Sequence, residues 1–144
     1  GIAGLGKQSV LALAKKNPAH IYFTGRDAEC AANLIAQVKL EGTASSARLT
    51  FLKCDMSSLA NVAEVTKQLA IKTERLDIMM CNAGVLSVAP CLTAGGYEFL
   101  FGIHHIAHAR LTKLLLPTLL RTPDAHVVIM SSQAFKGAPA AGIE

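Results

Sequence analysis

A glycine-rich turn near the start of the chain has the residue types of a phosphate-binding site. Gly4, Leu5 and Gly6 lead directly into the helical stretch 7–14. Glycines let backbone N–H groups and the positive end of a helix approach a pyrophosphate closely. The same residues are also typical of a turn that binds no ligand. The choice between these two interpretations therefore depends on residues further along the chain.

Arg26 supports the phosphate interpretation because of its position. It lies twenty residues after Gly6, at the end of the next expected strand. An acidic residue at such a strand end accepts hydrogen bonds from a ribose 2′-hydroxyl, whereas an arginine can pair with a 2′-phosphate. Arg26 therefore predicts NADP(H) rather than NAD(H). The neighbouring Asp27 is the argument for NAD(H), but we expect its carboxylate to cap the following helix.

Three clustered histidines raise the alternative of a metal site. His104 and His108 are one helical turn apart, with His105 beside them. Two imidazoles at this spacing can share a metal, but a catalytic site usually needs a third ligand and a supporting outer shell. No Asp or Glu lies within that turn. We therefore expect no metal here and assign these side chains mainly to a helix surface.

Short apolar or β-branched runs alternate with longer stretches of helical period. The expected strands span residues 20–24, 49–54, 76–81 and 127–131, and a last helical segment runs from about 95 to 120. This alternation predicts an α/β fold, in which a doubly wound parallel sheet has helices on both faces. The helical segments have apolar faces that we assign to the core: Ala31, Leu34, Ile35 and Val38; Leu59, Val62, Ala63, Leu69 and Ala70; Ile103, Ile106, Ala107, Leu111 and Leu114.

No strand precedes Gly1, although a strand before a phosphate-binding turn would be central in such a sheet. We therefore interpret residues 1–144 as a single partial dinucleotide-binding domain, an internal piece of a longer chain. The sheet is expected to have a gap between the second and fourth strands of the complete fold.

Composition excludes several classes of protein. About half of the 144 residues are apolar (51%), which argues against a disordered or fibrous chain. The net charge of +4 comes from scattered residues, so nucleic-acid binding is not expected. No apolar run approaches the roughly 20 residues of a membrane-spanning helix, and no secretory leader is visible. We expect a soluble, cytoplasmic protein whose four separated cysteines, Cys30, Cys54, Cys81 and Cys91, are reduced core thiols.

Three further segments carry a resemblance to a known family. They are Cys54-Asp55-Met56 after the second expected strand, Cys81-Asn82-Ala83-Gly84 after the third, and Val127 to Ser132 in and after the last. Together with the glycine turn, and in this order, they resemble the motifs of the classical short-chain dehydrogenases/reductases. The stretch from Gly96 to Pro117 is similar to the retinol-dehydrogenase-like and fungal light-induced alcohol-dehydrogenase-like branch of that family.

The resemblance implies a Rossmann fold and a role for each matching residue. Gly4 and Gly6 would border the cofactor phosphates and Leu5 the nicotinamide end. Asp55 and Met56 would contact adenine, and Asn82, Ala83 and Gly84 would border the ribose. Ser132 would be the catalytic serine that orients a carbonyl. His104 stands where the branch has a catalytic asparagine that holds a water, a task that an imidazole can also perform.

Two departures from the family pattern leave two hypotheses. The catalytic Tyr-x-x-x-Lys pair does not occur between Ser132 and Glu144, and His104 replaces the asparagine. The first hypothesis is an NADP(H)-dependent oxidoreductase that transfers hydride between nicotinamide and a small carbonyl or alcohol substrate, with a homo-oligomeric full-length form and an inactive isolated fragment. The second is a non-catalytic dinucleotide-binding relative that acts as a sensor or interaction module.

Overall fold

The computed structural model describes residues 1–41, 48–86 and 89–137. Four strands alternate with helices along the chain, as expected. The strands are β1 (His20–Gly25), β2 (Arg48–Lys53), β3 (Ile78–Cys81) and β4 (His126–Ile129). The longer helices are α1 (Gly4–Ala14), α2 (Ala28–Leu40), α3 (Leu59–Lys72) and α5 (Ala107–Arg121). Short helical segments are α4 (Phe99–Phe101), the π-helix η1 (Gly102–Ile106) and the 3-10 helix η2 (Gln133–Gly137).

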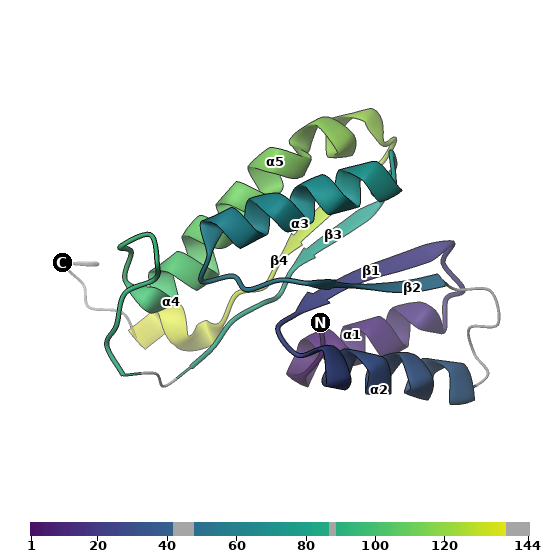
Figure 1. The fold of residues 1–144 in the computed structure, drawn as a ribbon, viewed down its shortest axis with the longest axis horizontal. Coiled ribbons are helices and arrows are strands. Elements are labelled where there is room, and N and C mark those ends of the chain that lie inside the picture. Colours follow the sequence, from purple (N-terminus) through teal and green to yellow (C-terminus); the bar gives the residue numbers. More distant parts are fainter. Residues whose placement is uncertain (42–47, 87–88, 138–144) are drawn as a thin grey trace.

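The strands form two parallel pairs with helices on both sides, which confirms the predicted α/β architecture (Figure 1). In the first pair, β1 and β2 run in register from His20 beside Arg48 to Gly25 beside Lys53. In the second pair, β3 and β4 run from Ile78 beside His126 to Cys81 beside Ile129. Figure 1 shows α1 and α2 on one side of the strands and α3 and α5 on the other.

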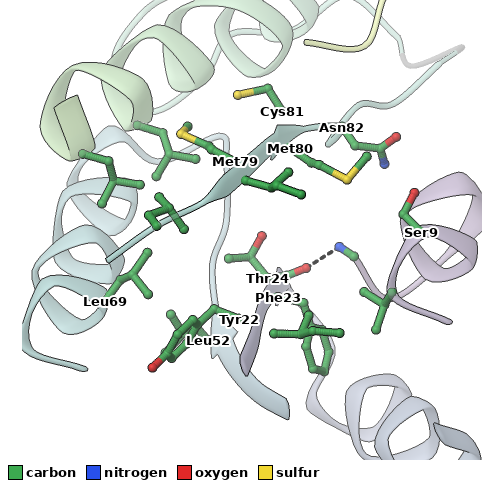
Figure 2. Close-up of a pocket in the computed structure, with 18 of the residues that line it drawn as sticks. Ser9, Tyr22, Phe23, Thr24, Leu52, Leu69, Met79, Met80, Cys81 and Asn82 are labelled. Atoms are coloured by element: carbon green, nitrogen blue, oxygen red, sulfur yellow. Dashed lines mark hydrogen bonds between the residues drawn. The ribbon is translucent and has the colours of Figure 1, made fainter. Parts of the chain in front are cut away.

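A cavity separates the two strand pairs. In the part of the chain that the structure describes, β1 and β3 share no ladder of hydrogen bonds. Residues from both strands line a cavity of about 400 Å³ between them. Figure 2 shows Phe23 and Thr24 of β1 on one side of this cavity and Met79 and Met80 of β3 on the other. The gap predicted from the sequence is therefore present.

Two apolar cores hold the helices against the strands. One consists of side chains from α1, β1 and α2: Val10, Leu11, Ala14, Ile21, Phe23, Ala31, Leu34 and Val38. The other joins α3 and α5 to the strand pairs through Leu52, Cys54, Val62, Val65, Leu69, Met79, Cys81, Ala107, Leu115 and Leu119. Ala31, Leu34 and Val38 of α2 are buried as predicted, and Ile35 is partly buried. In α3, Val62 and Leu69 are buried as predicted, whereas Ala70 is exposed.

The last long helical segment differs from its prediction. Helix begins at Phe99, because the Glu98 carboxylate accepts hydrogen bonds from the N–H groups of Leu100 and Phe101. The helix then includes the π-helical turn η1. Leu114, predicted as core, is 41% exposed, whereas its neighbour Leu115 is buried. A hydrophobic pattern read at an ideal helical period therefore placed the buried stripe one residue too early at this point.

Two further expectations concern the cysteines and membrane-spanning helices. Cys54 and Cys81 are buried, but Cys30 and Cys91 are exposed, so the prediction of four core thiols was wrong. Cys30 lies in the first turn of α2, where its thiol donates to the Asp27 carboxylate (3.4 Å) rather than packing in the core. Among the described residues, no helix combines the length and apolar character needed to cross a membrane.

Candidate functional site

The predicted phosphate turn forms the beginning of α1. Gly4 has a φ of +51°, a backbone conformation that side chains disfavour. The N-cap residue Ala3 provides no side-chain acceptor, so the first N–H groups of α1 have no capping side chain. Leu5 is 67% exposed beside them. A helix start of this kind can accept an anion such as a pyrophosphate.

Gly6 brings the turn into contact with the loop after β3. A Cβ atom at this position would lie 2.9 Å from Nδ2 of Asn82 and 3.1 Å from the Cα atom of Gly1. Only glycine therefore fits without a shift of the neighbouring atoms. The structure thus places two predicted cofactor-binding residues, 76 positions apart in sequence, side by side (82 − 6 = 76).

Gly84 and His104 form a second close contact at the same end of β3. A Cβ atom on Gly84 would lie 3.1 Å from Nε2 of His104. That same nitrogen accepts a hydrogen bond from the backbone N–H of Val85 at 2.9 Å. His104 was expected to hold a relay water, but in this structure its Nε2 accepts from the loop that follows β3. The π-helix that carries His104 was not predicted; such turns are frequent at functional sites.

Ser132 follows β4 on the neighbouring loop. The backbone N–H of Met130 donates to the carbonyl of Cys81 at 3.1 Å. This hydrogen bond extends the β3–β4 pairing past Ile129, so the chain segments that lead to Asn82 and to Ser132 leave the sheet together. Ser132 is exposed there. The parallel pairing is thus what places the predicted catalytic serine at the same edge as the predicted ribose-binding residues.

Asp27 caps α2, as predicted. Its Oδ1 atom accepts hydrogen bonds from the N–H groups of Glu29 (2.8 Å) and Cys30 (3.0 Å), and its Oδ2 atom accepts from the Cys30 thiol. The hydrogen bonds from Cys30 are the main reason why the pKa of Asp27 lies below its ordinary value. Arg26 stands next to this cap, exposed at the end of β1.

Arg26 also borders a small surface pocket of about 300 Å³, together with Lys53, Asp55 and Asn61. The Asp55 carboxylate accepts hydrogen bonds from the Ser57 N–H (2.9 Å) and hydroxyl (2.8 Å). The Asp55 N–H donates to Oδ1 of Asn61 at 2.6 Å. Lys53 and Asn61 were missed from the sequence. The sequence carried no signal for Lys53, because it is the register of the folded strands that places this residue beside Gly25.

The remaining residues singled out in the sequence are Met56 and the three histidines. Met56 is partly buried against the core beside β2, next to Asp55. His104 and His105 are exposed, but His108 is buried, so its assignment to the helix surface was wrong. This burial lowers the pKa of the His108 imidazole. Across residues 1–41, 48–86 and 89–137, no group of three His, Cys, Asp or Glu side chains is arranged to hold a metal ion.

Known proteins resemble this chain along almost its whole length. Residues 1–142 match the family model described as short chain dehydrogenase. A short chain dehydrogenase/reductase of Colletotrichum higginsianum is 37% identical over 92% of the chain, and human retinol dehydrogenase 13 is 33% identical over 91%. The chain spans 34% and 39% of these two relatives, respectively.

Solved structures share the fold. A metagenomic short-chain oxidoreductase in complex with NADP superposes with a TM-score of 0.79 at 21% identity, over 98% of this chain and 63% of that one. A short-chain dehydrogenase from Sphingobium yanoikuyae in complex with NADPH has a TM-score of 0.68 at 24% identity, over 83% and 46%. At these identities the likeness concerns the Rossmann-like fold alone.

Proposed function

Since the chain belongs to the short-chain dehydrogenase family, we propose that residues 1–144 are one dinucleotide-binding domain of an NADP(H)-dependent oxidoreductase. The enzyme would transfer hydride between nicotinamide and a carbonyl or alcohol substrate. The cofactor assignment rests on the different surroundings of Arg26 and Asp27 at the end of β1. Both carboxylate oxygens of Asp27 already accept hydrogen bonds from the start of α2, whereas the Arg26 side chain is exposed beside them. A ribose 2′-phosphate therefore finds a cation here, whereas a ribose hydroxyl would have to share Asp27 with the three hydrogen bonds that its carboxylate already accepts.

The remaining predicted residues fit a dinucleotide. The start of α1 at Gly4, Leu5 and Gly6 offers N–H groups without a side-chain cap, which suits the pyrophosphate. Asp55 borders the pocket at the end of β2, Met56 follows it in the chain, and both would contact adenine. Asn82, Ala83 and Gly84 follow β3 and would border the nicotinamide ribose. At Gly6 and Gly84 the absence of a Cβ atom allows the close approach of Asn82 and His104, respectively.

The chemistry at the nicotinamide end would be shared between cofactor and protein. When bound, the cofactor supplies or accepts the hydride. The Ser132 hydroxyl would donate a hydrogen bond to the substrate carbonyl and orient it. Proton transfer needs another group, because Tyr22 and Tyr97 are not followed by a lysine at the family's spacing. Tyr22 also donates its hydroxyl to the Lys72 carbonyl at 3.3 Å, which directs it to the end of α3.

Cofactor preference tests the proposal. In the full-length protein, NADPH should bind more tightly than NADH, and Arg26→Ala should narrow the difference by roughly tenfold or more, since a hydrogen bond to a charged group contributes about 1.5–3 kcal/mol. Titration of each cofactor by calorimetry gives both dissociation constants. Arg110→Ala, which removes an exposed arginine from α5, is the matched control. Equal binding of the two cofactors by the parent protein would overturn the assignment.

One contact favours a second candidate, a dinucleotide-binding protein without catalysis. Nε2 of His104 is engaged by the Val85 N–H and cannot at the same time accept from a relay water. Turnover of a broad panel of carbonyl substrates by the full-length protein separates the two functions. Tight NADPH binding without turnover, with activity restored by His104→Asn, would support the second candidate. Turnover by the parent protein would support the first.

A further inference from the structure

We propose that Lys53 is a second specificity-determining residue, which binds the cofactor's 2′-phosphate together with Arg26. This inference rests on the proposed NADP(H) function and deepens it. It is based on the observation that Arg26 and Lys53, two cations at the ends of neighbouring strands, border the same pocket.

The parallel register brings the two cations together. Gly25 lies beside Lys53 in the β1–β2 ladder, and the Cys54 N–H donates to the Gly25 carbonyl at 2.8 Å. Arg26 is the next residue after Gly25, so it leaves β1 directly beside the end of β2. Both side chains are exposed and both border the pocket of about 300 Å³. In sequence the two residues are 27 positions apart (53 − 26 = 27), so only the pairing of the strands makes them neighbours.

The acidic groups near this pocket already have partners. Asp27 accepts from the start of α2, and Asp55 accepts from Ser57. Over the described ranges of the chain, neither Arg26 nor Lys53 forms a salt bridge with a carboxylate. Lys53 is near enough to Asp27 for its charge to contribute, as the smallest of several causes after the hydrogen bonds from Cys30, to the lowered pKa of that carboxyl.

Two neighbouring cations without carboxylate partners suit a dianion better than a single negative charge. A phosphate monoester carries close to two negative charges near neutral pH. Arginine binds such a group through its planar fork of N–H donors, whereas lysine acts as a compact point charge that can approach from another side. Lys53 and Arg26 would thus contact different oxygens of one phosphate. The alternative is that Lys53 is only a solvated charge at a strand end.

Cofactor titration of the Lys53→Gln variant of the full-length protein separates these two readings. Affinities for NADPH and NADH are measured at low ionic strength and again near 0.15 M salt, where exposed charges are more strongly screened. We expect Lys53→Gln to weaken NADPH binding by about two- to fivefold at low salt, the range of exposed ion pairs, with NADH binding unchanged. The loss should shrink at the higher salt concentration. Lys53→Arg should retain NADPH affinity, and Arg48→Gln, at the opposite end of β2, should leave both affinities unchanged.

The outcomes distinguish this inference from the proposed function. If the parent protein binds NADPH no better than NADH, the proposed function fails, and Lys53 has no phosphate to recognise. If the parent prefers NADPH and Arg26→Ala reduces that preference, but Lys53→Gln leaves it intact, only the role of Lys53 is overturned. An equal loss for both cofactors in Lys53→Gln would also overturn it, because such a loss reports a change in the strand end rather than phosphate recognition.

Discussion

Nε2 of His104 accepts a hydrogen bond from the backbone N–H of Val85 at 2.9 Å. The accepting nitrogen carries no proton, so the neutral ring bears its proton on Nδ1. The contact joins the π-helical turn η1 to the loop that follows β3, which contains the predicted ribose-binding residues. His104 therefore positions that loop.

Removal of the His104 acceptor should loosen the loop after β3. His104→Leu leaves the Val85 N–H without its protein partner, so we expect a loss of about 0.5–1 kcal/mol in the free energy of unfolding and faster amide exchange at Val85. Urea unfolding and hydrogen exchange of the full-length protein measure the two effects. His105→Leu is the control, because His105 stacks on Phe101 instead of bonding to the loop. Equal exchange at Val85 in parent and His104→Leu would contradict the positioning role.

Gly102 should tolerate no Cβ atom unless Thr93 is trimmed. A Cβ at Gly102 would lie 2.5 Å from the Thr93 methyl carbon, whereas the Thr93 hydroxyl accepts a hydrogen bond from the Tyr97 N–H (3.2 Å). Gly102→Ala should therefore reduce the free energy of unfolding by about 1–3 kcal/mol, the range for overpacking. The double variant with Thr93→Ser, which keeps the hydroxyl and removes the methyl, should recover much of that loss. The same deficit in single and double variants would show that this methyl is not the obstacle.

Protonation of Asp27 in acid should weaken its hydrogen bonds to the start of α2 and so lower the free energy of unfolding. The pKa of Asp27 is lowered, chiefly by the hydrogen bonds from Cys30, so its ionised form is stabilised in the folded protein. This contribution is fully present above the ordinary value of 3.8 and is lost as the pH falls through the lowered folded value. Asp27→Asn keeps a capping oxygen but cannot ionise. Free energies of unfolding measured against pH should therefore fall less steeply in acid for Asp27→Asn than for the parent. Parallel curves would contradict this assignment.

The open strand edges beside the cavity should make residues 1–144 aggregation-prone and inactive when isolated, because unpaired strand edges recruit other chains. Met80 of β3 lines the cavity and is 37% exposed. A lysine there should oppose edge-to-edge pairing, so Met80→Lys should raise the soluble fraction. Ile71→Lys changes a more exposed side chain on α3 (87%) and should help less. Light scattering and sedimentation measure the difference. A parent fragment that is soluble and unfolds cooperatively would show that the open edges are harmless.

Local chemistry made several site residues predictable. Asp27 follows a strand and precedes a helical stretch, and its carboxylate caps that helix because the acceptor and the free N–H groups are within three residues of each other. Gly4 is recognisable for a similar reason, since its positive φ is a local requirement, whereas the requirement for glycine at position 6 comes from Asn82 and Gly1. The predicted core face of α2 is confirmed, and that of α3 is confirmed at Val62 and Leu69, because burial follows the helical period where the helix is regular.

The sequence by itself determined the alternation of strands and helices, the α/β class and the resemblance to the short-chain dehydrogenases, because these depend on periodicity and on short motifs. Only the tertiary structure decided which distant residues meet. The contacts of Gly6 with Asn82 and of Gly84 with His104 depend on how helices and strands pack, and the approach of Lys53 to Arg26 depends on the register of β1 and β2. The hydrogen bond from Val85 to His104, which lies in the π-helical turn, likewise joins distant parts of the chain. Such contacts join segments far apart in the chain, so local sequence spacing carries no information about their distance.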